Sequence, residues 1–158
     1  MKSGRIWKFN DNIDTDQIIA SQYLLLPTID QMKAYTFEGI IPGFTNHFFP
    51  GDLMVTGENF GCGSSREQAP RVLKAIGVGA VIGNSFARIF FRNSINIGLP
   101  LIQCQGLHEN VTDGESLSYD IEGAVIHYKD RDYRFSHFPE HVLKIIRCGG
   151  LIPYINQF

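Results

Sequence analysis

Residues 52–104 read "DLMVTGENFGCGSSREQAPRVLKAIGVGAVIGNSFARIFFRNSINIGLPLIQC", and short apolar runs alternate in them with amphipathic ones. The runs "DLMVTG", "VGAVIG" and "LPLIQC" are typical of buried strands, whereas "RVLKAIG" and "SFARIFFRNSINIG" are typical of helices. We expect Ser85 to cap the second helix and Gly98 to end it. Strands that alternate with helices predict a βαβαβ unit with a largely parallel, buried sheet.

The residues before this segment predict one strand and one short helix. "GRIWKF", residues 4–9, is typical of a strand, and the acidic stretch "NDNIDTD" after it is expected to be a loop. "SQYLLLPT", residues 21–28, predicts an exposed apolar loop that Pro27 interrupts. Thr28 and Gln31 have the spacing of a capping box, so a short helix is expected there, with Gly39 as its end.

The residues after the segment have a different pattern. "SLSYDI", "GAVIHY" and "YRFS" predict short antiparallel strands joined by turns. "FPEHVLKIIRCGG" predicts a helix with Pro139 near its first turn and Gly149 past its end. The whole chain, residues 1–158, is therefore expected to form a single α/β domain with mixed parallel and antiparallel strands.

Composition narrows the classes of partner. Fourteen Lys plus Arg stand against 16 Asp plus Glu, a net charge of -2, so no strong field favours nucleic acid or a membrane surface. No apolar run approaches the roughly 20 residues of a membrane span and no signal peptide is evident, which predicts a cytoplasmic protein. Cys62, Cys104 and Cys148 lie far apart without a CxxC pair, so neither a disulfide framework nor a metal site is expected.

The loop "GENFGCGSSREQAP", residues 57–70, is the main candidate site. It lacks the GxxxxGK(S/T) spacing of a nucleotide-binding loop. Its glycines allow a ligand to approach the backbone, and Arg66 beside Ser64 and Ser65 suits a carboxylate. Ser64 and Glu67 also have capping-box spacing, so a purely structural role stays open. Pro70 is expected to make the first turn of the helix irregular.

Four segments carry a resemblance to a known family: "NIDTDQIIASQYLLLPT", "ENFGCGSSREQAP", "SFARIFFRNSINIGLPL" and "VLKIIRCGGLIPYI". Together they resemble the small subunits of 3-isopropylmalate dehydratase, the leucine-biosynthesis branch of the aconitase superfamily. The similarity extends from end to end of the chain. It implies a swivelling β/β/α domain like the C-terminal domain of aconitase.

The resemblance also implies a reaction and a partner. The family members are hydro-lyases that remove water from a small diacid, 2-isopropylmalate, and return it to the neighbouring carbon. A separate large subunit would carry a 4Fe-4S iron-sulfur cluster and this chain no cofactor. Activity would therefore require both subunits.

The roles of individual residues follow from the same resemblance. Ser64 matches the serine that takes and returns the carbon-bound proton, and Ser65 and Arg66 match residues that bind a substrate carboxylate. The other implied site residues are the active-site neighbours Asp16, Cys62 and Gly63, and the loop residues Tyr23, Leu24, Leu25 and Leu26, which would meet the substrate's side group. Arg88 and Arg92 share a helix face and are interpreted as solvent-exposed or structural.

Several alternatives stay open. Homoaconitase-like relatives place an arginine in the loop where this chain has leucines, which favours an alkyl-substituted malate, but citramalate or 2,3-dimethylmalate would fit as well as isopropylmalate. Gln68 departs from the histidine of the family pattern and cannot titrate as histidine does. A non-enzymatic anion- or RNA-binding module is a further alternative, which the nearly balanced charge disfavours.

Overall fold

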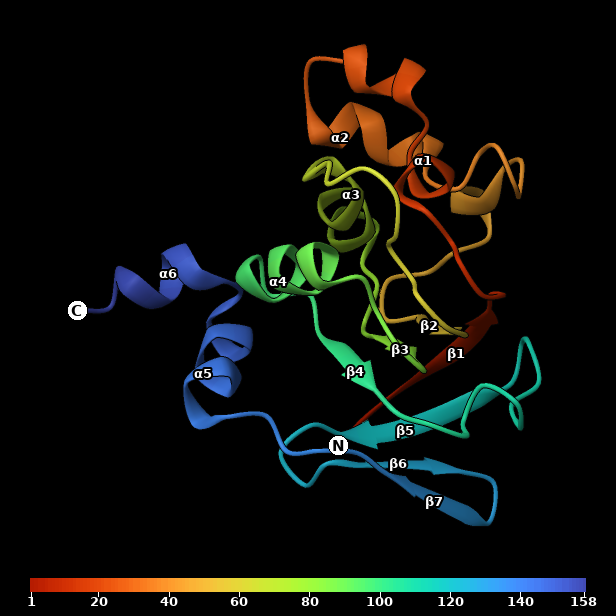
Figure 1. The fold of residues 1–158 in the computed structure, drawn as a ribbon, viewed down its shortest axis with the longest axis vertical. Coiled ribbons are helices and arrows are strands. Elements are labelled where there is room, and N and C mark those ends of the chain that lie inside the picture. Colours follow the sequence, from red (N-terminus) through yellow and green to blue (C-terminus); the bar gives the residue numbers. More distant parts are fainter.

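Seven strands form one sheet in the computed structural model, which describes residues 1–158 (Figure 1). Their order across the sheet is β4-β3-β2-β1-β5-β6-β7. The strands are β1 (Lys2–Lys8), β2 (Leu53–Thr56), β3 (Val81–Gly83), β4 (Leu101–Gln103), β5 (Ser116–Asp120), β6 (Val125–Tyr128) and β7 (Arg131–Arg134).

Strand β1 joins a parallel half of the sheet to an antiparallel half. Its last residues pair in parallel with β2, with Ile6 opposite Leu53, whereas its first residues pair antiparallel with β5, with Lys2 opposite Tyr119. Strands β2, β3 and β4 continue the parallel half, and β5, β6 and β7 continue the antiparallel half. The predicted mixed α/β sheet is therefore confirmed.

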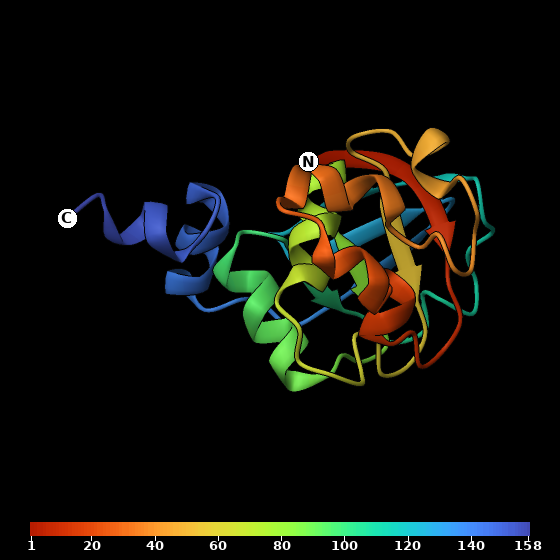
Figure 2. The same ribbon diagram turned by 90° about the horizontal axis from the view of Figure 1, so that it is seen from above.

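The helices between β1 and β4 connect the strands of the parallel half and cover one of its faces. The α-helices are α1 (Thr15–Ile18), α2 (Ile29–Met32), α3 (Gln68–Ile76), α4 (Arg88–Asn96), α5 (Glu140–Cys148) and α6 (Leu151–Ile155), and three 3₁₀ turns span Ser21–Leu25, Lys33–Tyr35 and Phe44–Asn46. Helices α5 and α6 extend sideways from the body of the molecule, and the C-terminus lies at the end of this extension (Figure 2). None of the helices has the length and hydrophobicity that crossing a bilayer requires.

Two buried clusters lie on opposite faces of the parallel strands. On β2, Met54 packs in the cluster under the helices, while Leu53 and Val55 pack in the cluster that includes residues of β5, β6 and β7. Side chains alternate between faces along a strand, so a strand covered on both sides needs apolar residues at every position. This requirement explains why "LMV" and "VI" are unbroken apolar runs.

The start of α3 differs from the sequence prediction. The helix begins at Gln68, and Glu67 at the N-cap position makes no side-chain capping bond. Ser64 lies four residues before the helix, so the capping-box interpretation of Ser64 and Glu67 is wrong. Pro70 occupies the first helical turn, where a missing N–H removes no intrahelical hydrogen bond, and the expected irregularity is therefore absent.

Two other helix ends also differ from expectation. Ser85 does not cap α4, which starts at Arg88, because the Ser85 hydroxyl accepts from Asn59 N and donates to Glu58. The helical segment after Thr28 ends at Tyr35, before Gly39. Two short helices, α1 and α6, were not expected. Helix α1 lies in the acidic stretch after β1 and carries a complete capping box, and α6 follows Gly149.

Candidate active site

The candidate site lies where the loops after β1, β2 and β3 meet at the carboxyl ends of the parallel strands. Backbone contacts join these loops: Gly61 N donates to Ile13 O at 2.7 Å, and Ala87 N donates to Phe60 O at 3.0 Å. Ligand sites of open α/β sheets form at this end of the strands. The parallel topology therefore brings together residues that lie far apart in the sequence.

Two glycines of the "GCGSS" stretch are required by the local backbone. Gly61 has a φ of +84°, and a Cβ there would lie 2.2 Å from Cγ of Phe90. Gly63 has a φ of +89°, a backbone conformation that residues with a side chain rarely adopt. Phe90 is 3% exposed and sits in the first turns of α4, so the serine loop packs directly on the start of that helix.

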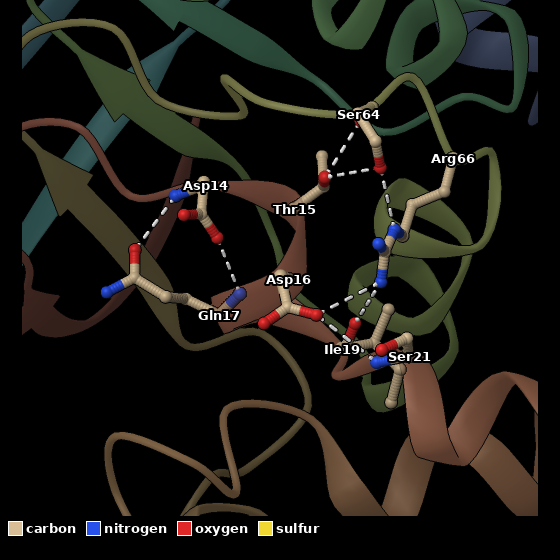
Figure 3. A network of polar contacts seen from close by, with 8 residues as sticks. All are labelled: Asp14, Thr15, Asp16, Gln17, Ile19, Ser21, Ser64 and Arg66. Atoms are coloured by element: carbon tan, nitrogen blue, oxygen red, sulfur yellow. Dashed lines mark hydrogen bonds and ion pairs between the residues drawn. The ribbon is translucent and has the colours of Figure 1, made fainter.

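Ser64 is the centre of a network of polar contacts (Figure 3). Its Oγ accepts a hydrogen bond from Nε of Arg66 at 2.9 Å and lies 3.3 Å from Oγ1 of Thr15. The Thr15 hydroxyl in turn donates to the carbonyl oxygen of Ser64 at 2.8 Å. Because that bond uses the only Thr15 hydroxyl proton, the Ser64 hydroxyl is left to donate to Thr15 while it accepts from Arg66.

Arg66 is held by acceptors from the residues after β1. Its Nη1 donates to the carbonyl oxygen of Ile19 at 3.0 Å and lies 3.5 Å from Oδ1 of Asp16, which also accepts from Ser21 N (Figure 3). The Asp16 side chain is 61% exposed, so this ion pair orients Arg66 more than it stabilises the fold. The structure thus brings together Asp16, Ser64 and Arg66.

A cavity of about 300 Å³ opens beside the two serines. It is lined by Thr15, Gly61, Gly63, Ser64, Ser65, Arg66, Ala87, Arg88, Ile89, Phe90 and Asn93. Two arginines and no carboxylate are among these residues, so the cavity suits an anion. Ser65 is exposed and makes no hydrogen bond, which leaves its hydroxyl available to a ligand.

Sequence reasoning missed two residues of this site, Thr15 and Arg88. The interpretation of Arg88 as only solvent-exposed or structural omits its place in the cavity wall. Its position offered a signal, because Arg88 lies just after an expected buried strand and the carboxyl ends of parallel strands share one edge. Thr15 lies in the stretch that was expected to be an irregular loop.

Cys62 contributes to the site through its backbone. Its carbonyl oxygen accepts from Thr15 N at 2.9 Å, and residues 14 and 62 form an isolated parallel bridge. Burial raises the pKa of the Cys62 thiol, and the charge of Asp14 raises it further. A thiol that stays protonated is a poor nucleophile, so the side chain is not suited to covalent catalysis.

The apolar loop after α1 forms a 3₁₀ turn and is divided between core and solvent. Tyr23 stacks on Tyr35 with ring centroids 4.3 Å apart, and Tyr23, Leu24 and Leu26 pack against the buried cluster. Leu25 is 89% exposed. None of the four lines the serine cavity, although the loop adjoins the site through the contact between Ser21 and Asp16.

The residues of this chain do not group as ligands of a metal. No cluster of three or more His, Cys, Asp or Glu side chains is close enough to hold an ion, and the three cysteines are separate and free.

Gln68, which stands where the family pattern has histidine, is the first residue of α3 and makes no side-chain hydrogen bond.

The fold and the serine–arginine loop define an aconitase-type C-terminal domain. The family model described as the aconitase C-terminal domain matches residues 46–106. A small subunit of 3-isopropylmalate dehydratase from Lachnospira eligens is 46% identical over 98% of this chain and 94% of its own length. An isopropylmalate/citramalate isomerase small subunit from Methanocaldococcus jannaschii is 43% identical over 98% and 93%.

A solved structure supports the same assignment. The crystal structure of 3-isopropylmalate dehydratase (leuD) from M. jannaschii superposes with a TM-score of 0.91 at 38% identity, covering 98% of this chain and 93% of that one. The chain belongs to the family of 3-isopropylmalate dehydratase small subunits.

Proposed function

We propose that this chain is the small subunit of a cytoplasmic hydro-lyase that converts 2-isopropylmalate to 3-isopropylmalate in leucine biosynthesis. The observation that carries the proposal is the Arg66–Ser64 hydrogen bond at the wall of a cationic cavity, in a chain whose relatives carry this enzyme's name. The partner would be a large subunit that holds a 4Fe-4S cluster. The cluster would supply the Lewis acid that polarises the leaving hydroxyl.

The reaction is an elimination followed by an addition. A proton leaves the carbon next to the carbinol carbon and passes to the ionised Oγ of Ser64, and the hydroxyl leaves the carbinol carbon as hydroxide, so that an alkene diacid is formed. Hydroxide then adds to the carbon that lost the proton, and Ser64 returns its proton to the carbon that had carried the hydroxyl. The product is an isomer of the substrate, so no oxidant or reductant is needed.

The free energy needed to ionise the Ser64 hydroxyl explains why this subunit is expected to be inactive by itself. If the Ser64 hydroxyl resembles water, with a pKa of about 15.7, ionising it near neutrality requires a shift of roughly 8 units, or about 11 kcal/mol. One well-placed donor such as Arg66 supplies about 3 to 4 kcal/mol. Ser64 is exposed in this chain, so the remainder requires a partner that closes the site and excludes water.

Neighbouring side chains would assist Ser64 in two ways. Arg66 Nε already donates to the Oγ that must carry negative charge, and rotation of the Thr15 hydroxyl would add a second donor. Ser65 and the free Nη2 of Arg66 would bind a substrate carboxylate. Asp16 would hold the guanidinium in place, and Cys62 and Gly63 would shape the backbone of the loop.

Selectivity for the alkyl group would come from the loop after α1. Leu25 is the member of the quartet Tyr23–Leu26 whose side chain is free to meet a substrate. An apolar surface there favours an isopropyl group by about 0.8 kcal/mol per buried CH2-sized unit over a smaller substituent. Citramalate, with a methyl group, is the second candidate substrate, because the M. jannaschii relative is named for both activities.

Reconstitution tests the proposal directly. The chain and the large subunit from the same source are mixed anaerobically, and the absorbance of the alkene diacid is followed after addition of 2-isopropylmalate, citramalate or homocitrate. Ser64→Ala is assayed beside Ser116→Ala, a matched control at an exposed strand position outside the site. We expect turnover of isopropylmalate that Ser64→Ala abolishes and Ser116→Ala leaves intact.

Other outcomes would revise specific parts of the proposal. Turnover confined to citramalate or homocitrate would keep the mechanism and replace the substrate. Full activity of Ser64→Ala in a complex of normal affinity would remove Ser64 as the base. Failure to form any complex with the large subunit would contradict the proposed enzyme.

A further inference from the structure

Arg88 is a cation without a partner at the edge of the serine cavity. It is exposed, and its side chain makes no hydrogen bond and no ion pair with the rest of the chain. Arg66, the other arginine of the cavity, is already engaged with Ser64, Asp16 and Ile19. The two arginines therefore differ in availability, and Arg88 has all of its donors free.

The backbone of Arg88 is positioned relative to the serine loop by buried contacts. Ala87 N donates to Phe60 O, and residues 60 and 86 form a parallel bridge. The rings of Phe60 and Phe90 lie 5.3 Å apart, and Phe90 leaves no room for a side chain at residue 61. Because Arg88 is the first residue of α4, these contacts hold it against the cavity that Ser64 and Ser65 line.

The two guanidinium groups of the cavity match a molecule with two carboxylates. Arg66 and Arg88 both line it, and Asp16, which pairs with Arg66 at 3.5 Å, is not among the lining residues. A malate derivative carries two carboxylates on adjacent parts of a short carbon chain, and each is bound best by a guanidinium fork. With Ser65 and Arg66 assigned to one carboxylate, Arg88 is the guanidinium group of this cavity that is free to bind the second.

We propose that Arg88 binds the second carboxylate of the diacid substrate, and so acts as a specificity-determining residue of the site. The inference rests on the proposed function, since it takes the substrate to be a dicarboxylate. Arg88 and Arg66 then approach the diacid from two walls of the cavity and fix its orientation over Oγ of Ser64. The matched comparison is Arg92, which lies one turn further along α4, is also exposed and unpaired, and does not line the serine cavity.

The test compares Arg88→Met, Arg88→Lys and Arg92→Met in the reconstituted two-subunit enzyme, each at saturating large subunit. Inhibition is measured with isopropylsuccinate, a dicarboxylate that has no hydroxyl to eliminate, and with 4-methylpentanoate, which has a single carboxylate. We expect Arg88→Met to lower kcat/KM by about 10- to 100-fold, mainly through KM, and to raise the Ki of isopropylsuccinate by a similar factor. Arg88→Lys should recover part of the loss, and Arg92→Met should stay within about twofold of wild type.

The other possible results separate a failure of the role proposed for Arg88 from a failure of the proposed function. An unchanged Ki of isopropylsuccinate in Arg88→Met, in an enzyme that Ser64→Ala still inactivates, would overturn the role of Arg88 and leave the proposed function intact. A defect that excess large subunit removes would show that Arg88 is a docking contact, which also overturns the inference. An equal rise in the Ki of 4-methylpentanoate would indicate a general distortion of the cavity, which would overturn the specific role of Arg88. A wild-type enzyme that is inactive on every alkylmalate would remove the proposed function itself.

Discussion

Arg66 donates a hydrogen bond from Nε to Oγ of Ser64 at 2.9 Å, although only one residue separates them in the chain. No helix has begun at this point, since α3 starts at Gln68, and the guanidinium folds back onto Ser64 from a non-helical segment. The same guanidinium reaches across to the residues after β1. Arg66 is thus the link between Ser64 and the neighbouring loop.

Replacing Arg66 should weaken catalysis more than folding. Arg66→Gln removes the donor that would stabilise negative charge on Ser64, and loss of one such donor costs about 10²- to 10³-fold in kcat. The measurement is the steady-state rate of the reconstituted enzyme on 2-isopropylmalate. Arg71→Gln, which removes an exposed cation that pairs only loosely with Glu67 on α3, is the control and should keep near-normal kcat. Normal kcat in the Arg66→Gln enzyme would contradict the role of Arg66.

Gly61 should be intolerant of any side chain. Gly61→Ala combines a φ of +84° with a Cβ placed 2.2 Å from Cγ of Phe90, and overpacking of this kind costs about 1 to 3 kcal/mol beyond the backbone strain. Gly106→Ala is the matched control, because its φ is +87° and nothing lies within 4 Å of the new Cβ. Urea unfolding should show a clearly larger loss for Gly61→Ala. Equal losses would mean that the contact with Phe90 relaxes freely.

Leu25 should tune the choice of substrate without affecting the fold. Leu25→Arg places a cation at a position that is 89% exposed, and we expect it to raise activity on homocitrate relative to 2-isopropylmalate, because the extra carboxylate gains a partner. The ratio of kcat/KM values for the two substrates is the measurement. Ile152→Arg, at a position on α6 that is 71% exposed, controls for an added surface charge. An unchanged ratio would place the side-group pocket elsewhere.

Asp52 should make stability depend on pH in the acid range. Burial alone would raise the pKa of Asp52, but hydrogen bonds from Phe49 N, Trp7 and Arg5 outweigh it and hold the pKa below its usual range. A folded-state pKa below the unfolded one adds stability that is present above about pH 4 and is lost as the pH falls through the folded value.

The test of that linkage is urea unfolding of wild type and Asp52→Asn at pH 7 and pH 3. Asp52→Asn should lose about 1 to 3 kcal/mol at pH 7 and should differ less from wild type at pH 3, because the stability that the wild-type carboxylate contributes declines once the pH falls below the unfolded-state pKa. Asp30→Asn is the control, since its 85% exposed side chain makes an i,i+3 pair of little value. A difference that stays constant with pH would contradict the linkage.

The order of strands and helices was predictable from residues 52–104 because local signals determine it. Unbroken apolar runs such as "LMV" require burial on both faces, and Gly77 and Gly149 end their helices in the left-handed conformation. Helix starts were less predictable. Ser64 and Ser85 both have the spacing and the side chain of a cap, and both make other hydrogen bonds instead.

The sequence by itself determined the fold class, the family resemblance and the loop that carries Ser64, Ser65 and Arg66. Only the tertiary structure decided that Thr15 bonds to Ser64, that Leu25 alone of its quartet faces solvent, and that Arg88 lines the cavity. The physical reason is that secondary structure follows from periodicity over a few residues. A site at the carboxyl ends of parallel strands is instead assembled from loops far apart in the chain, whose mutual positions are set by strand register and by packing such as Phe90 on Gly61.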